Sequence, residues 1–317
     1  MAEHREDSAL RWYHKIGLEL LWAWCRVVYY APRWFRFYVV SPFFYAVLSL
    51  VRYRRGVILN NIRNSFPENS AAECRRLMRR YYKMLAEVIV CTMSLAGAKP
   101  ERDGDIMIWE DAEKHIERMR GRDWVAMAAH FGCWEYFLLW CWRDTESRFL
   151  GVYHPLRSTI FEHFYRRLRA LAPNIVQTPM KETLRLYLRN RAEGRGVVLG
   201  LISDQSPILR ADLGWYKFLN QDTVFVEGGE KFASRFHIPL YFVHVRRIAA
   251  GRYAARFEEL YDGVEEFAPG ELTRRYARAL ESMIREAPEL WMWSHKRWKH
   301  TPEKQAAKFG IEKKVAK

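Results

Sequence analysis

The segment VAMAAHFGCWEYFLLW, residues 125–140, places two titratable side chains, His130 and Glu135, in otherwise apolar surroundings. An imidazole beside a carboxylate is the arrangement of a general base, because the carboxylate orients the ring and stabilises its protonated form. The H-x4-E spacing alone is weak evidence, since a half-buried histidine with a solvent-facing glutamate gives the same pattern. Cys133 between them could act as an acyl-accepting nucleophile, but its aromatic neighbours favour a packed, unreactive thiol.

Polar side chains also follow two other predicted strands. GVYHPL places His154 after one strand, and LISDQSP places Asp204 and Gln205 after another. Turn chemistry before a proline is the alternative explanation for the Asp-Gln pair. If these strands are neighbours in one parallel sheet, their polar ends meet at the same crevice as His130.

Strand-like and helix-like segments alternate from residue 123 onward. We predict strands at 123–130, 148–153, 175–178, 196–203, 239–248 and 253–260, and helices at 133–142, 158–171, 180–193, 228–236 and 270–288. This alternation predicts an α/β fold with a mixed, mainly parallel central sheet flanked by helices. His130 ends a predicted strand and Glu135 lies in the first turns of the next helix. Both are therefore expected at the crevice edge, beyond the carboxyl ends of the strands.

Several common cofactor and metal motifs are missing from the sequence. Gly228 and Gly229 open a predicted helix whose free N–H groups could face an anion. The chain has neither the GxxxxGK[ST] loop nor the GxGxxG fingerprint, so nucleotide binding is not indicated. HExxH, a His-rich metal spacing and the GxSxG elbow are also absent. We expect no cofactor and no metal.

Composition restricts the class of partner. The chain has 317 residues, half of them hydrophobic, with a formal net charge of +15. This length supports a sizeable core. The charge calls for an anionic partner, namely nucleic acid, an anionic membrane surface or an acidic protein. The five cysteines form no CxxC pair and have no regular spacing, which argues against a disulfide framework and indicates a reducing environment.

Residues 16–51 are crowded with aromatic side chains and dotted with arginines. Their longest charge-free run, residues 37–51, has 15 residues and contains Pro42, whereas a simple spanning helix needs about 20 apolar residues. No small-residue cleavage site follows a short apolar core, so a removable signal peptide is not expected. We favour an interfacial or marginally spanning membrane anchor over a pair of core helices. The basic RYRR that follows suits an anchor facing anionic cytoplasmic lipid.

The motif HFGCWE resembles the H-x4-[DE] motif of the glycerolipid acyltransferase superfamily, in the Glu form found in the lipid A late acyltransferases (lauroyl/myristoyl acyltransferases). Five further segments resemble that family and occur in its order: YRRGVILNNIRNSFPE, GVYHPL, SDQSP, DTVFVEGGEKFASRFHIPLYFVHVRR and LWMWSHKRWK. Together these elements run from about residue 50 to residue 300. His154 departs from the family pattern, which usually has Arg there, and so does Ser206-Pro207. Both departures could alter donor or acceptor preference.

The resemblance implies an O-acyltransferase that moves a fatty acyl chain to a hydroxyl of a lipid A precursor or similar lipid. The donor would be an acyl thioester, either of acyl carrier protein or of coenzyme A. His130 would be the general base, and Glu135 would orient it and balance its charge. Roles in oxyanion stabilisation, substrate binding or positioning would fall to Arg167, Asp204, Gln205 and His154. Arg167 is the cation expected near the oxyanion, whereas Arg166 and Arg169 are interpreted as parts of a solvated helix face.

We divide the chain into an anchor with its basic flank (1–55), an acyltransferase domain (56–300) and a basic tail (301–317). Within the domain, Ser70 and Glu73 form the capping-box pattern of a helix from about 71 to 95. The predicted location is the inner membrane, with the domain facing the cytoplasm and acting on lipid of the inner leaflet.

Three alternatives remain open from the sequence. The acceptor could be a different hydroxylated membrane lipid. The chain could be a non-enzymatic basic protein that binds membrane or nucleic acid, although its aromatics cluster in predicted core and anchor segments and no nucleic-acid motif is recognisable. It could also be a hydrolase or thioesterase that uses the same histidine.

Overall fold

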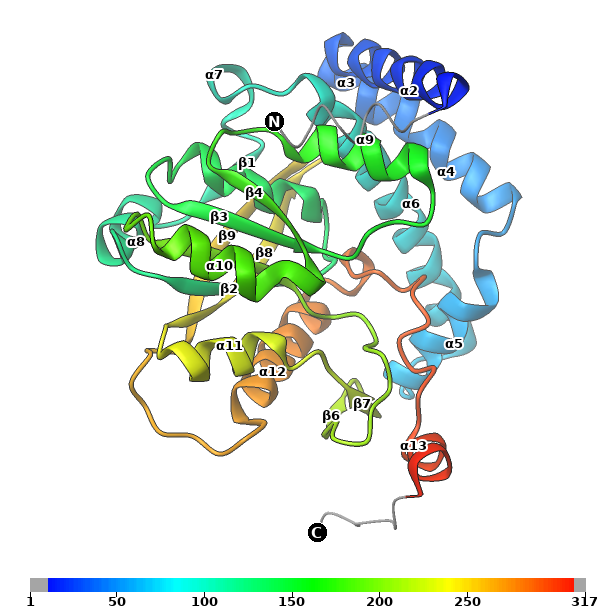
Figure 1. Cartoon of the computed structure of the whole chain (residues 1–317). Coiled ribbons are helices and arrows are strands. Elements are labelled where there is room, and N and C mark those ends of the chain that lie inside the picture. The colour runs from blue at the N-terminus through cyan, green and yellow to red at the C-terminus, as the bar shows by residue number, and fades with distance from the viewer. Residues whose placement is uncertain (1–10, 311–317) are drawn as a thin grey trace.

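The computed structural model describes residues 11–310 and, within them, a seven-stranded sheet with helices around it (Figure 1). The strand order is β1-β9-β8-β2-β5-β3-β4. Strands β8, β2, β5, β3 and β4 run parallel to one another, while β9 is antiparallel to β8 and parallel to β1. The predicted α/β fold with a mixed, mainly parallel sheet is confirmed.

The elements have the following bounds. The strands are β1 (Met107–Trp109), β2 (Trp124–Ala128), β3 (Arg148–Tyr153), β4 (Ile175–Pro179), β5 (Val197–Ile202), β6 (Trp215–Phe218), β7 (Gln221–Val224), β8 (Leu240–Ala249) and β9 (Arg252–Tyr261). The α-helices are α2 (Trp12–Tyr30), α3 (Arg33–Phe35), α4 (Ser41–Leu50), α5 (Arg55–Ser65), α6 (Ala71–Ser94), α7 (Pro100–Asp103), α8 (Ala112–Met119), α9 (Thr159–Arg169), α10 (Thr183–Arg191), α11 (Gly228–Phe236), α12 (Glu271–Glu286) and α13 (Pro302–Phe309). Tighter or wider turns form η1 (Arg36–Val40), η2 (Leu95–Gly97), η3 (Trp134–Trp142), η4 (Met180–Glu182) and η5 (Pro288–Leu290).

The pairing of β2 with β5 fixes the position of two polar side chains. In this parallel pair Ala128 lies opposite Ile202. His130 and Asp204 each follow two residues later, so both leave the sheet at the carboxyl ends of adjacent strands. The strands themselves are apolar and β2 is fully buried, as expected for a central strand covered on both faces. The sheet register therefore brings together two residues that are 74 positions apart in sequence.

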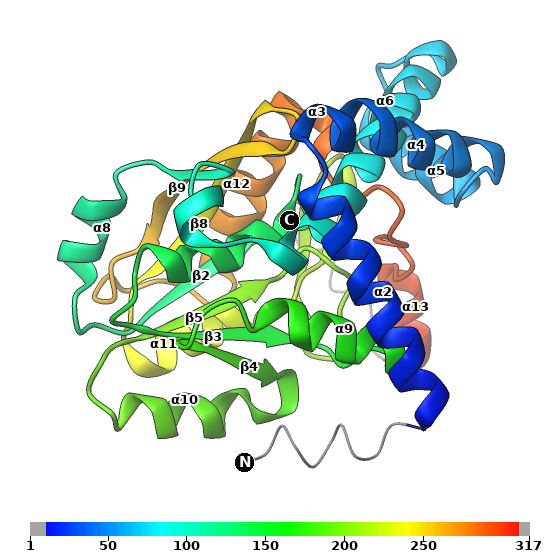
Figure 2. The same ribbon diagram turned by 90° about the horizontal axis from the view of Figure 1, so that it is seen from above.

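Helical layers cover both faces of the sheet. Adjacent residues of a strand point to opposite faces of the sheet. The neighbours of two glycines show which helical element covers each face. A Cβ on Gly229 of α11 would meet Met127, whereas a Cβ on Gly200 would meet Phe137 of η3. Gly200 pairs with Ala126, the neighbour of Met127, so α11 and η3 lie on opposite faces. Figure 2 shows β4 pointing toward the side of the molecule along which α2 lies.

Helices α5 and α6 hold the C-terminal segment 291–297 in place. The Asn61 side chain donates to the carbonyls of Trp293 and His295, at 2.9 and 2.8 Å. Tyr81 of α6 donates from its hydroxyl to the Ser294 hydroxyl at 2.8 Å. The predicted capping box of Ser70 and Glu73 is present at the start of α6, and that helix ends within a residue of its predicted end. The helical hairpin thus supports a segment more than 200 residues away.

The N-terminal helices α2, α3 and α4, with the wide turn η1 between α3 and α4, pack beside α6 and α9 (Figure 1). Within residues 11–310, no single helix is long and apolar enough to cross a membrane. The stretch Arg33–Leu50 and the helix Arg55–Ser65, bent by 92°, reach that threshold only as a pair. The anchor assigned to residues 1–55 stays a prediction, and its first ten residues lie outside the described part of the chain. Residues 311–317 of the predicted basic tail lie outside it as well.

Some elements escaped sequence analysis. The short edge strand β1 and the hairpin β6–β7 were not predicted, and the hairpin turns through Leu219 and Asn220, both at positive φ. Such a two-residue turn is usually announced by glycine, and this chain has none there. The segment 133–142, predicted as a regular helix, forms the tighter η3.

Gly132 holds the backbone in a conformation that the chain needs beside His130. Its φ is +56°, and its amide donates to the Leu290 carbonyl at 2.8 Å. A Cβ at this position would lie 2.6 Å from a ring carbon of Tyr253, closer than any real Cβ contact. Both the left-handed backbone and the packing thus require glycine here.

We expect Gly132→Ala to lower the free energy of unfolding by about 2–5 kcal/mol, from backbone strain plus overpacking against Tyr253. The matched control is Gly121→Ala, which has φ +67° and open space around it and should lose only about 1–2 kcal/mol. Denaturant unfolding of both variants measures the difference. Equal losses would contradict the packing constraint.

Candidate active site

His130 and Asp204 form a hydrogen-bonded pair at the crevice end of the sheet. The His130 Nδ1 atom lies 2.7 Å from Asp204 Oδ1, and the His130 amide donates to Oδ2 at 3.1 Å. The His130 side chain is 17 % exposed and that of Asp204 only 2 %. One carboxylate thus fixes both the backbone and the ring of the histidine, while solvent can still reach the imidazole.

The C-terminal segment completes the setting of Asp204. Trp291 donates its indole N–H to Asp204 Oδ2 at 2.8 Å, and the Met292 amide donates to the His130 carbonyl at 3.1 Å. A single antiparallel bridge between Phe131 and Trp291 aligns the two segments. Trp291 was not singled out from the sequence, although it lies in the LWMWSHKRWK motif. The sequence around Trp291 has no helix or strand periodicity that would indicate which group its indole N–H contacts.

The ionised state of Asp204 determines the form of the imidazole. Burial alone would raise the pKa of the Asp204 carboxyl, but its contacts with His130 and Trp291 outweigh burial and hold the pKa below the ordinary aspartate value. An ionised carboxylate accepts from Nδ1, so the neutral imidazole carries its proton on Nδ1 and its lone pair on Nε2. The Gln205 Nε2 atom lies 3.2 Å from that Nε2 and can donate to it. The lone pair on His130 Nε2 therefore faces the side-chain amide of Gln205.

Glu135 contacts an arginine instead of His130. Its two oxygens accept a fork of hydrogen bonds from Arg169 Nε and Nη2, at 3.1 and 2.7 Å. Glu135 is 6 % exposed and the Arg169 side chain 23 %. Burial would lower the pKa of Arg169, but Glu135 outweighs it and raises that pKa. The expectation that Glu135 orients His130 is therefore corrected, because Asp204 makes that contact, and the interpretation of Arg169 as a solvent-facing residue was wrong.

The remaining predicted site residues lie farther from the pair. Arg167 binds Glu19 of α2 at 2.7 Å and its guanidinium lies 4.3 Å over the Trp22 ring, so its contacts tie α9 to the N-terminal helix. His154 is exposed just beyond the end of β3, with Nδ1 3.0 Å from the Pro155 carbonyl. Neither contact involves His130 or Asp204. A sequence reading could not tell which α9 arginine faces inward, because three of them lie within four positions.

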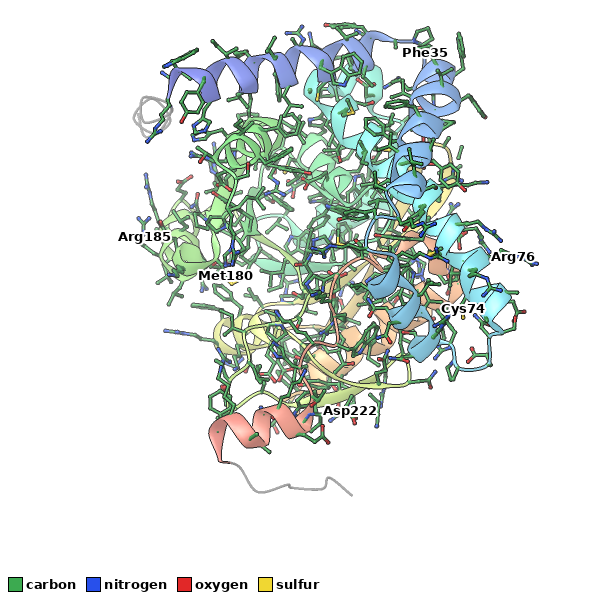
Figure 3. All side chains as sticks on the ribbon, turned by 90° about the vertical axis from the view of Figure 1, so that its right-hand side faces the viewer. Phe35, Cys74, Arg76, Met180, Arg185 and Asp222 are labelled. Carbon is green, nitrogen blue, oxygen red and sulfur yellow. The ribbon has the colours of Figure 1, made fainter. Side chains whose placement is uncertain are left out.

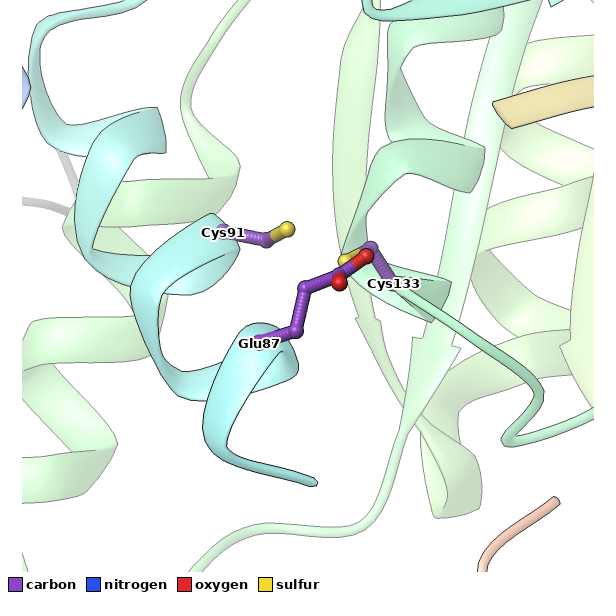
Figure 4. A group of neighbouring side chains, drawn as sticks. All are labelled: Glu87, Cys91 and Cys133. Carbon is purple, nitrogen blue, oxygen red and sulfur yellow. The ribbon is translucent and has the colours of Figure 1, made fainter. Parts of the chain in front are cut away.

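A second cluster joins Glu87 and Cys91 of α6 to Cys133 (Figure 4). Their ligand atoms lie within 4.8 Å of one another, which is a spacing that could hold a metal ion. The Glu87 carboxylate is engaged, however, by Arg247 Nε and Nη2 at 2.9 and 2.8 Å and by the Tyr253 hydroxyl at 2.8 Å. Burial, with help from Cys91, raises the pKa of the Cys133 thiol well above its ordinary value. These contacts favour a buried structural network and an unreactive thiol.

Comparison with protein families decides the class of protein. The family model described as bacterial lipid A biosynthesis acyltransferase matches residues 9–300. The chain belongs to this family. The lipid A acyltransferase match begins inside the segment 1–55 and includes every residue of the site described above. No curated protein sequence matches the chain.

Membership in the lipid A acyltransferase family makes the protein an acyltransferase of lipid A and lipopolysaccharide biosynthesis. The resemblance stated from HFGCWE and the five other segments is thereby confirmed. Within the chain, the three segments that meet at the site are the ends of β2 and β5 and residues 291–292. The family motifs thus mark chain segments that are distant in sequence and adjacent in the fold.

We expect the Glu135–Arg169 pair to stabilise the fold. Glu135→Gln or Arg169→Met leaves an uncompensated partner and should cost about 3 kcal/mol each, while the double variant should cost less than the sum by about 1–3 kcal/mol. Arg167→Met is the control, because its exposed pair with Glu19 is worth under about 1 kcal/mol. Denaturant unfolding of the four variants gives the coupling, and strictly additive losses would contradict a buried pair.

Proposed function

We propose that this acyltransferase moves a fatty acyl chain from an acyl thioester, that of acyl carrier protein, to a hydroxyl of a lipid A precursor, with His130 as the general base. The observation that supports the proposal most is the His130–Asp204 pair, with Nδ1 held by a buried carboxylate and Nε2 left as the basic atom. The predicted orienting role passes from Glu135 to Asp204.

The reaction follows from this geometry. The acceptor hydroxyl takes the place of the Gln205 amide at His130 Nε2, gives its proton to that atom and attacks the thioester carbonyl. The C–O bond forms, the C–S bond breaks, and the imidazolium returns the proton to the leaving thiolate. Asp204 stabilises the imidazolium throughout, in the manner of the carboxylate of a catalytic triad. No acyl-enzyme is needed, which agrees with the buried, protonated thiol of Cys133.

A donor must stabilise the negative oxygen of the tetrahedral intermediate. Gln205 has the required group at the required place, because its amide nitrogen already lies 3.2 Å from His130 Nε2. Once the acceptor displaces this contact, the amide N–H is free to face the oxyanion. Arg167, proposed for this task from the sequence, is engaged with Glu19 and Trp22 in α2. We therefore assign the oxyanion donor to Gln205.

The net charge of +15 supports the choice of partners. Carrier proteins are acidic, and lipid A precursors and inner-leaflet lipids carry negative charge, so a basic surface steers each of them toward the enzyme. Coenzyme A thioesters share the reacting group and the negative charge. Turnover of the same acyl group on carrier protein and on coenzyme A separates the two donors.

Membrane association is supported by the N-terminal helices. Large apolar side chains stand exposed along α2, α3, η1 and α4: Trp12, Leu20, Trp24, Val27, Tyr30, Trp34, Tyr38, Phe43 and Leu50. Leu50 is 83 % exposed, and Arg26 and Arg33 lie among these side chains. Figure 3 shows α2 across the top of the molecule and α4 turning down its right-hand side, with Phe35 at the corner between them. An apolar face of this size with interspersed arginines suits the headgroup zone of the inner membrane, with the catalytic domain in the cytoplasm.

We expect His130→Ala to lower kcat by about a thousandfold or more, because it removes the base. Asp204→Asn should lower kcat by about a thousandfold as well, since the amide favours the wrong tautomer. Acyl transfer is measured with acyl carrier protein thioester and a purified lipid A precursor, and the product is weighed by mass spectrometry. Asp212→Asn, at an exposed aspartate, is the control and should stay within about twofold of the parent.

Near-normal turnover of folded His130→Ala would contradict the proposal. Release of free fatty acid by the parent enzyme, with no acylated lipid, would point instead to a thioesterase.

We expect the exposed aromatics of the N-terminal helices to bind lipid. Replacing Trp24, Trp34 and Tyr38 together by Ser should weaken partitioning onto phosphatidylglycerol-containing vesicles by about tenfold or more. Ile208 and Val264 are as exposed, at 80 % and 82 %, but lie elsewhere in the chain, so their replacement by Ser is the control. Co-sedimentation with vesicles measures both. Equal loss in the two variants, or no loss in the first, would contradict an N-terminal membrane face.

A further inference from the structure

Arg297 is an anomaly in the interior of the domain. The residue is only 2 % exposed, yet its three guanidinium nitrogens, Nε, Nη1 and Nη2, have no hydrogen-bond partner among the described residues. The guanidinium carbon lies 4.5 Å from the centroid of the Phe225 ring, and the backbone amide of Arg297 donates to the His295 carbonyl at 2.8 Å. Arginine is almost never fully buried without a carboxylate partner, and nearly every buried polar group elsewhere in proteins is bonded.

The charge of Arg297 persists despite this burial. Burial lowers the pKa of the guanidinium to about 10, and Asp204 and Tyr276 act in the opposite direction. The side chain is therefore a cation at neutral pH. A dry cation without hydrogen bonds is costly, and a stacked ring offsets only part of the cost. A position that retains such a group at the expense of stability is a candidate for function.

The surroundings of Arg297 place it behind the catalytic pair. Phe225, on which the guanidinium rests, packs against Tyr276 at 6.0 Å between ring centroids. The Tyr276 hydroxyl donates to the Ala128 carbonyl at 2.9 Å, and the Ser203 amide donates to the same carbonyl at 3.3 Å. Ala128 ends β2, and Ser203 immediately precedes Asp204. The rings of Phe225 and Tyr276 thus connect the cation to the ends of the two strands that carry His130 and Asp204, and its charge interacts with that of Asp204.

We propose that Arg297 is a positioning residue of the catalytic pair, whose fixed positive charge adds to the donors of Asp204 and opposes a second positive charge on the imidazole of His130. This inference rests on the proposed role of His130 as base. Arg297 acts through Asp204 and does not touch substrate, because it is buried. Without the cation, Asp204 and His130 alone would form an ion pair that holds the proton at higher pH and removes the lone pair that the reaction needs.

The other groups around the pair do not supply this charge. His295 is neutral near pH 7, because burial lowers its pKa to about 4, while Asp204 raises it and Arg297, His130 and Lys299 lower it further. Tyr276 is kept protonated because burial raises its pKa well above the ordinary value. The ring and amide groups that contact His130 and Asp204, namely Trp134, Gln205 and Trp291, carry no charge. Lys299 is exposed, so solvent screens it.

The test is the pH dependence of kcat/KM for acyl transfer by the full chain. Arg297→Met removes the charge at similar length, and its acid limb should move to higher pH by roughly one unit, with the plateau at high pH retained within about threefold. Arg297→Lys keeps the charge and should keep the acid limb of the parent enzyme. Lys299→Met removes an exposed charge from the same segment and should leave the limb in place.

Thermal unfolding of the same variants separates this role from a structural one. Because no hydrogen bond holds the guanidinium, Arg297→Met should have a Tm equal to or above that of the parent. Arg297→Gln, neutral and polar, serves as a second variant with the same expected shift if the methionine variant folds poorly. The inference would be overturned if the acid limb of the pH profile stays in place in Arg297→Met and Arg297→Gln. It would also be overturned if Arg297→Lys shifts that limb as much as the neutral variants do. Those results would leave His130 as the base, which only the His130→Ala variant tests.

Discussion

The Asp204 carboxylate is the contact on which the site depends. It lies at the end of a buried strand and accepts from the ring of His130, from the His130 amide and from the indole of Trp291. The donors come from two segments that are held in place independently: the end of β2 by the β2–β5 register, and the segment 291–297 by α5 and α6. The cost of burying the charge is met by these three donors, which is why the pKa of Asp204 stays low in an apolar interior.

Sequence reasoning reached the fold and part of the site. Alternation of strand and helix patterns was enough to predict the sheet, because a parallel strand buried on both faces is an apolar run that stands out between amphipathic helices. Asp204 could be located at the crevice by the same reasoning. Its pairing with His130 could not be predicted, because the order of strands in the sheet depends on how the layers pack. No local sequence pattern encodes that packing. The five-residue spacing of His130 and Glu135 suggested a pair, yet the tight turn through Gly132 sends the two side chains to different partners.

The two polar residues of the H-x4-E motif therefore have different structural roles, although they lie in one short turn. His130 at its start belongs to the crevice, while Glu135 at its end fastens α9 to η3 through Arg169. A bidentate arginine–carboxylate contact fixes orientation as well as distance, so the motif ties the segment of His130 to the helix layer beside it. This arrangement explains a carboxylate in an apolar stretch without assigning it any proton transfer. The cluster of Glu87, Tyr253 and Arg247 stabilises the other side of the same turn, because Tyr253 packs against Gly132.

The position of Trp291 in the sequence determines when the hydrogen bonds of Asp204 can form during synthesis. His130 and Asp204 come early in the chain relative to the Trp291 indole that donates to Asp204. The segment that carries Trp291 is held by α5 and α6, which precede both residues. During synthesis the sheet strands β2 and β5 leave the ribosome well before this segment does. A nascent chain that has released only these strands therefore lacks one of the three donors of Asp204. The hydrogen bonds around Asp204 are complete only after residues 291–297 have been synthesised and have packed against α5 and α6.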